Sequence, residues 1–190
     1  MFTLFFVATA LSACGGGGDS STDSSGTASA VSSIAQMAGT YIMPCKGTTF
    51  PPSSNPSADT SESETATIVI TPDAATGKAT ISARAQTYHN SATCDAAALE
   101  FDLTFHGTAT DGPGSKNYTN AAGKPVTAKV ATIAYTGMTL SKGNLDFSLP
   151  LAGATTKLAY VLENNTLYLA KGSRQADGLG DSLTPGAVKQ

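Results

Sequence analysis

Residues 99–106 read Leu-Glu-Phe-Asp-Leu-Thr-Phe-His, an unbroken alternation of apolar and polar side chains. A period of two is the pattern of a β-strand with one buried face and one face in water. We therefore predict an antiparallel strand here. Its leucines and phenylalanines point inward, and Glu100, Asp102 and His106 lie on a solvated face.

The same period recurs along the chain between turn residues. It predicts further strands at 39–43, 65–70, 78–88, 126–135, 144–149, 158–162 and 167–169. Glycine, proline and asparagine supply the turns between them, at 72–77, 111–114, 120–125, 142–144 and Asn164-Asn165. One turn of helix is expected within 92–99, and no longer helical pattern follows the first residues.

About eight sequential antiparallel strands, each with one apolar face, must bury those faces together. An up-and-down barrel does so and leaves no unpaired edge, so we predict an all-β antiparallel barrel, with a two-sheet sandwich as the alternative. At this strand number the interior is filled by side chains or holds one small ligand. Three small side chains on the inward face, Ala79, Ala83 and Ala85, leave room for a ligand or for large neighbours.

The beginning of the chain carries a separate signal. Residues 2–11 form an apolar run that is too short to span a bilayer and is typical of an export signal. It ends in Leu11-Ser12-Ala13-Cys14, which resembles the lipobox of bacterial lipoproteins. The resemblance implies that Cys14 becomes lipidated and begins the mature chain. No Lys or Arg precedes the apolar run, which departs from the family pattern, and a free Cys14 after an ordinary cleaved signal is the alternative.

This resemblance divides the chain into a signal peptide (1–13), a lipidated Cys14 with a flexible tether (14–34) and a single β domain (35–190). The tether is nearly all Gly, Ser, Thr, Ala and Asp, which bury too little apolar surface to order a segment. Two or three acyl chains, such as palmitate, would hold the protein on a membrane. Gly15, directly after the cysteine, points by resemblance to the outer membrane of a Gram-negative envelope.

Three cysteines are present. With Cys14 lipidated, Cys45 and Cys94 remain as a pair in an oxidising compartment, and we predict a disulfide between them. Two buried thiols or a metal pair are the alternatives. His89 lies near Cys94, but no cluster has the spacing of a zinc site.

Composition and motifs exclude several function classes. Charged residues make up 13% of the chain, the net charge is −3, and no basic cluster occurs, so nucleic acid is not an expected partner. The common catalytic signatures are missing, and we predict no enzyme, catalytic residue, cofactor or metal. The segment Asp177–Asp181 offers too few oxygen ligands for a calcium loop and is expected to pack across a barrel end.

Residues 37–185 are similar to small envelope lipoproteins of Gram-negative bacteria, mostly of unknown function. The similarity rests on Gly39-Thr40-Tyr41, the paired cysteines and the Asn165–Leu169 strand. An anchor, a spacer and a β domain without a catalytic set predict a non-catalytic binding or adaptor module for a small apolar ligand or an envelope protein. A structural or surface-interaction lipoprotein is the first alternative. A hydrolase with a dispersed site on the Glu100 and His106 face is the second.

Overall fold

The computed structural model describes residues 33–49, 61–120, 123–144, 152–171, 175–184 and 186–190. Within these ranges lie nine strands and two short 3-10 helices, η1 and η2. The elements follow in the order η1 (Ile34–Gln36), β1 (Gly39–Thr49), β2 (Ser61–Asp73), β3 (Lys78–His89), η2 (Ala96–Ala98), β4 (Leu99–Thr119), β5 (Pro125–Lys142), β6 (Thr155–Glu163), β7 (Thr166–Lys171), β8 (Ser182–Leu183) and β9 (Ala187–Lys189).

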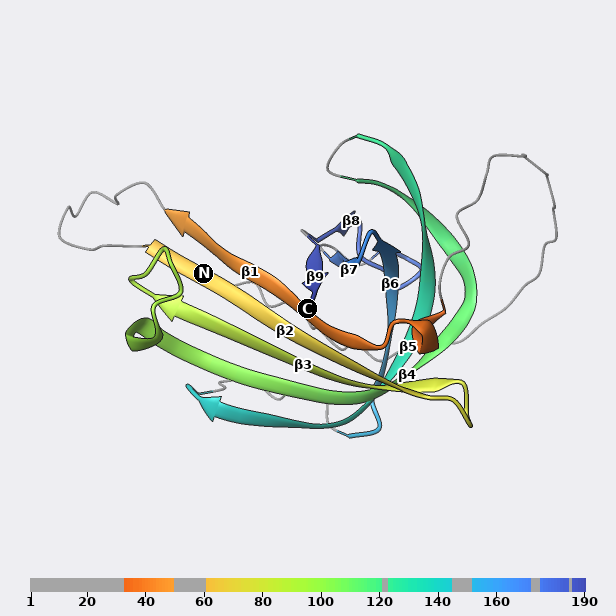
Figure 1. The fold of residues 1–190 in the computed structure, drawn as a ribbon, viewed down its shortest axis with the longest axis horizontal. Coiled ribbons are helices and arrows are strands. Elements are labelled where there is room, and N and C mark those ends of the chain that lie inside the picture. The colour runs from red at the N-terminus through yellow and green to blue at the C-terminus, as the bar shows by residue number, and fades with distance from the viewer. Residues whose placement is uncertain (1–32, 50–60, 121–122, 145–151, 172–174, 185) are drawn as a thin grey trace.

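The strands close into an antiparallel barrel (Figure 1). Strands β1 to β7 pair in chain order, β7 also pairs with β9, and β9 pairs with β1. The ring therefore has eight strands, and β8 is an extra strand on β7. The predicted all-β barrel is confirmed.

The strand that closes the ring differs from the expectation. The last strand of the ring is β9, three residues next to the C-terminus, which the alternation pattern did not indicate. Its two neighbours are β1, at Tyr41 and Ile42, and β7, at Thr166 and Leu167. The strand predicted at 144–149 lies outside the described residues except for Asn144.

The turn predicted at 111–114 is wrong. Strand β4 continues through it, and Gly112, Pro113 and Gly114 form a bulge between the Asp111–Ala131 and Ser115–Lys129 pairs. A bulge with flexible glycines bends a strand without ending it. The β4–β5 hairpin therefore extends past the barrel and curves back over it (Figure 1).

Apolar side chains pack on both faces of the barrel wall. The inner cluster includes the fully buried Tyr41, Leu103, Tyr160 and Leu167. The outer cluster joins Tyr118, Ala128, Val130, Ala159, Val161 and Leu179. Leu179 thus packs on the outer wall, because successive residues such as Val130 and Ala131 face opposite sides. The segment expected to cover a barrel end covers this wall instead.

No helix in the described part of the chain is both long enough and apolar enough to span a bilayer.

Candidate functional site

A plug occupies the barrel end where β1 begins. It is formed by η1 and Met37, and its turn is closed by the Ser33 N–H, which donates to Gln36 Oε1 at 3.0 Å. The side chains of Ile34 and Met37 are 2% and 1% exposed and belong to the inner cluster. The plug packs against β2, β3 and β4, so this end of the interior is filled.

Polar contacts hold the plug in place. The Tyr160 hydroxyl donates to Asp111 Oδ1 at 2.6 Å, and the Ile34 N–H donates to the same oxygen at 3.2 Å. On the other side, the Tyr41 hydroxyl donates to the Met37 carbonyl at 3.2 Å. Burial, followed by the hydrogen bond to Asp111, raises the pKa of Tyr160, and burial raises the pKa of Tyr41. Both phenols therefore stay protonated and act as donors at neutral pH.

Beyond the plug, the barrel is lined by rows of inward side chains, and Tyr41 of the row nearer the plug contacts the plug directly. Cross-strand partners share a face of a sheet, so the ladder defines which side chains line up. One row crosses β1 to β5 through Met43, Ala66, Ala85, Leu103 and Leu140. The next row crosses the same strands through Tyr41, Ile68, Ala83, Phe105 and Met138. Neither row contains a charged side chain, and together we call them the apolar wall.

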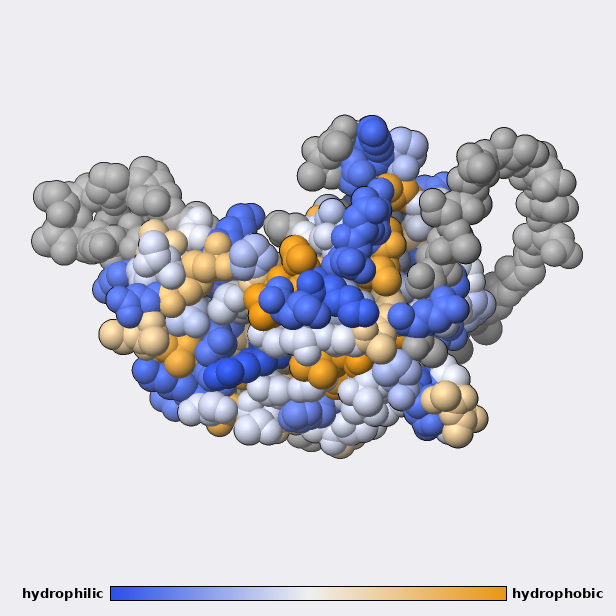
Figure 2. Space-filling model, in the orientation of Figure 1, coloured by the Kyte–Doolittle hydropathy of each residue, from blue (hydrophilic) through white to orange (hydrophobic). Residues whose placement is uncertain are grey.

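The apolar wall is partly open to solvent. Nearer the plug, the inward side chains of Ala79, Ala109 and Ala131 are fully buried. Along the wall Met138 is 37% exposed, and Met43, Ala66, Ala85 and Leu140 are only half-buried. The exterior in Figure 2, where individual residues are not marked, is mostly hydrophilic with apolar residues near the middle of the view. The predicted inward position of Ala79, Ala83 and Ala85 is confirmed.

The closed ring is shorter than the longest strands. Strand β6 pairs with β5 only from Lys129 to Ala134, and β9 pairs with β1 only at Tyr41 and Ile42. In the described ranges, β1 to β5 therefore extend beyond the ring as a curved sheet (Figure 1). The apolar wall lies where the ring gives way to this sheet.

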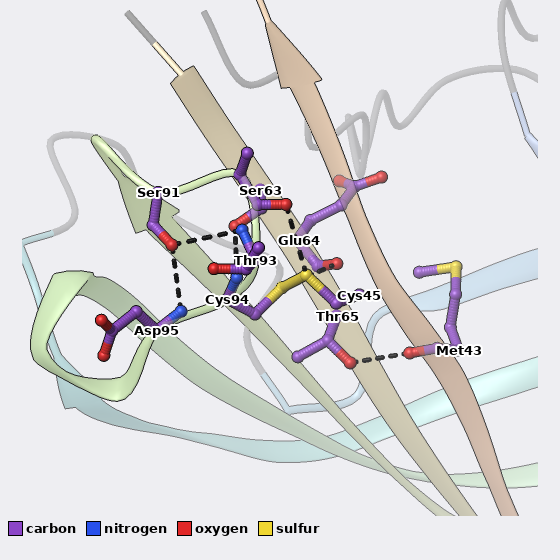
Figure 3. The surroundings of a disulfide bond; sticks show 10 residues. Met43, Cys45, Ser63, Glu64, Thr65, Ser91, Thr93, Cys94 and Asp95 are labelled. Carbon is purple, nitrogen blue, oxygen red and sulfur yellow. Dashed lines mark hydrogen bonds between the residues drawn. A yellow bond between two sulfur atoms is a disulfide. The ribbon is translucent and has the colours of Figure 1, made fainter. Parts of the chain in front are cut away.

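A disulfide between Cys45 and Cys94 fixes the rim of the extended sheet (Figure 3). Its Cα atoms are 5.9 Å apart, and the predicted pairing is confirmed. The Cys94 N–H donates to Ser63 Oγ at 3.0 Å, and the Asp95 N–H donates to Ser91 Oγ at 3.0 Å. The bond thus joins the bulge within β1 to the loop after β3, across β2.

One prediction for the outer face of β4 is wrong. Asp102 was predicted to lie on a solvated face, but it is only 3% exposed. Its carboxylate accepts from Arg84 Nε at 2.8 Å and from Arg84 Nη2, and Gln86 Nε2 lies 3.4 Å away. The hydrogen bonds from Arg84 lower the pKa of Asp102 against the effect of burial. A bidentate guanidinium pair therefore covers a side chain that alternation alone places in water.

The residues of the dispersed-hydrolase hypothesis are not assembled into a catalytic group. The cross-strand partners of His106 are Ser82 and Gly137, which supply no carboxylate. Glu100 is exposed at the beginning of β4, six residues away. Since Asp102 is engaged by Arg84, the described residues of this face bring no acid–base pair to His106.

The C-terminal acidic segment, Asp177–Asp181, is attached to β4 by an ion pair and a hydrogen bond. Asp177 pairs with Lys116 Nζ at 2.8 Å and caps its own turn by accepting from the Leu179 N–H at 2.9 Å. The Tyr118 hydroxyl donates to the Gly180 carbonyl at 3.0 Å. Among the described residues no three His, Cys, Asp or Glu side chains are grouped to hold a metal ion.

Sequence reasoning missed the plug and its supports. Ile34 and Met37 stand three residues apart after a long polar segment, and this spacing was the available signal. Asp111 gave none, because it stands beside Gly112-Pro113-Gly114 and was assigned to a turn. Comparisons with protein-family models, with curated proteins and with solved structures find no match to this chain.

Proposed function

We propose that this protein is an envelope lipoprotein that binds a small apolar ligand on the apolar wall, without catalysis. The observation that supports ligand binding is an uncharged inward face that is partly exposed at Met138 and its neighbours. A ligand that covers about 200 Å² of apolar surface gains roughly 5 kcal/mol. This gain corresponds to a Kd of about 0.2 mM, and association costs weaken it, so we expect affinities in the range of about 0.2 mM or weaker.

The direction of the chain supports the same proposal. The described part begins at Ser33, which leads directly into the plug. Along β1, the apolar wall begins beside the plug and is followed by the disulfide at Cys45. A tether from Cys14 would therefore reach the plugged end and leave the apolar wall facing away from the anchor. Lipidation of Cys14 and an outer-membrane location are parts of this proposal and rest on the lipobox resemblance.

An envelope protein is the second candidate partner. Val69 and Val188 are exposed on the outer face, and Ile42, which pairs with Val188, lies on the same face. A protein that docks there would cover aliphatic side chains outside the barrel. This outer patch and the apolar wall face opposite sides, so variants separate the two candidates.

Binding of a neutral fluorescent naphthylamine to the full chain tests the primary proposal. Ala83→Glu places a charge in the apolar wall, and Ser82→Glu places the same charge on the outer face one residue earlier. We expect saturable binding that Ala83→Glu abolishes and Ser82→Glu leaves within about twofold. Equal effects of both variants, with both folded by circular dichroism, would contradict the proposal.

A further inference from the structure

We propose that the Cys45–Cys94 disulfide is a redox-sensitive latch, whose reduction releases the end of β1 and the loop 90–95 while the plugged half of the barrel stays folded. The inference concerns the rim of the extended sheet. It does not depend on ligand binding.

The end of β1 is weakly paired. Beyond Ile42, its neighbour within the described residues is β2 alone. A register shift between Met43 and Lys46 interrupts even this ladder, with Pro44 and Cys45 in the bulge. A proline has no N–H to donate, so the disulfide lies where backbone hydrogen bonding between β1 and β2 is weakest. The last four pairs, from Lys46 to Thr49, follow this interruption.

The loop that the disulfide joins to β1 is also outside the ladder. Asn90 and Cys94 both have φ of 55°, a left-handed conformation that cysteine rarely adopts. Hydrogen bonds to the Ser63 and Ser91 hydroxyls help to hold the loop (Figure 3). The disulfide restrains Cys94 together with these hydrogen bonds, so its removal takes away one of the restraints on this conformation.

The loop and β1 also come close together at Gly47. A Cβ atom at Gly47 would lie 2.3 Å from the Ala92 carbonyl oxygen, so the two backbones are in close contact. A side chain there would push the loop away from β1. The bond closes a loop of 49 residues.

The exposed sulfur defines the chemistry. Cys45 is exposed and Cys94 is half-buried, so the thiolate of an external dithiol attacks Cys45 Sγ. The Cys45–reductant bond forms, and Cys94 Sγ leaves and takes up a proton. The second thiol of the reductant then attacks the reductant's own sulfur and releases Cys45 as a thiol. Two electrons pass to the protein, and the dithiol becomes a disulfide.

The plugged half has independent support. Its fully buried side chains include Ile34, Tyr41 and Tyr160, and the hydrogen bonds of Asp111 connect the plug to β6. None of these contacts passes through the latch. Reduction should therefore open the rim locally, as happens where a structure divides into regions of different stability.

Hydrogen-exchange mass spectrometry with thiol trapping tests the latch on the full chain. After native treatment with dithiothreitol, both latch thiols should react with maleimide. The rate of amide hydrogen exchange in residues 43–49 and 90–95 should rise by about tenfold or more. The amides of residues 103–109 and 131–135 should stay protected from exchange. Removal of the reductant and addition of oxidised glutathione should restore the slow exchange.

Two glycine variants sharpen the test. Gly47→Ala should speed reduction, because its Cβ displaces Ala92, whereas Gly137→Ala, with no atom within 4 Å of its Cβ, should not. The Cys45→Ser, Cys94→Ser double variant should show the released pattern at all potentials. A disulfide that reacts only in denaturant, reduction without faster exchange, or simultaneous loss of all protection would each overturn the proposal.

Discussion

Removal of the Tyr160 hydroxyl tests how the plug is held. In Tyr160→Phe the ring is retained, and the hydroxyl is lost together with its 2.6 Å hydrogen bond to Asp111. A hydrogen bond to a charged group contributes about 1.5–3 kcal/mol. Asp111 is exposed, so water replaces the hydroxyl at the carboxylate. We therefore expect the free energy of unfolding to fall by about 1–2 kcal/mol.

A double-mutant cycle separates this bond from other effects. Asp111→Ala removes the acceptor of both Tyr160 and the Ile34 N–H, and it should cost about 2–3 kcal/mol. The double variant should cost about 1 kcal/mol less than the sum of the single variants. Urea unfolding at constant m-value gives each free energy. Strict additivity, or no measurable effect of Tyr160→Phe, would show that Asp111 does not hold the plug through Tyr160.

Three further predictions concern other parts of the barrel. The pKa of Asp102 is lowered in the folded state, so the unfolded state takes up this proton first as the pH falls. The stability that this carboxylate contributes is therefore present above pH ~4 and is lost below it. Asp102→Asn should flatten the pH dependence of the urea midpoint in that range, and an unchanged pH dependence would refute the Arg84 pair as its cause. Replacement of Cys45 and Cys94 by serine should leave a folded protein that is less stable by about 4 kcal/mol, from the entropy of a 49-residue loop, and a loss under 1 kcal/mol in denaturant titration would contradict this. Leu179→Ala should cost about 2–3 kcal/mol in thermal unfolding, because Leu179 is buried in the outer cluster, and a neutral effect would show that the C-terminal segment is not fastened there.

Much of the barrel follows from local pattern. The alternation in 99–106 places Leu103 and Phe105 inside, and the two asparagines at 164–165 have the positive φ that a tight hairpin turn requires. The disulfide was predicted from the two cysteines that remain once Cys14 is set aside, in a chain expected to be exported. These features depend on residues that are close in sequence or on the number of cysteines, so they can be predicted from the sequence alone.

The parts that were missed depend on contacts between distant segments. Three residues of β9 carry too short an alternation to be recognised, and only the gap between β1 and β7 makes them a strand. Asp102 is buried because Arg84 lies on the neighbouring strand. Asp111 stands before a Gly-Pro-Gly bulge that looks like a turn, yet its carboxylate reaches the plug 77 residues away. Pattern reasoning has no access to such partners.

The most direct test of ligand binding is to locate the ligand within the barrel. A spin-labelled alkane added to the methyl-labelled full chain should broaden the Met138 and Ala85 methyl signals of the apolar wall first. Val188, on the outer face, is 45% exposed against 37% for Met138, so unspecific adsorption would reach Val188 at least as readily. Broadening of Met138 and Ala85 at concentrations that leave Val188 sharp is the predicted result. Equal or earlier broadening of Val188 would contradict a site on the apolar wall.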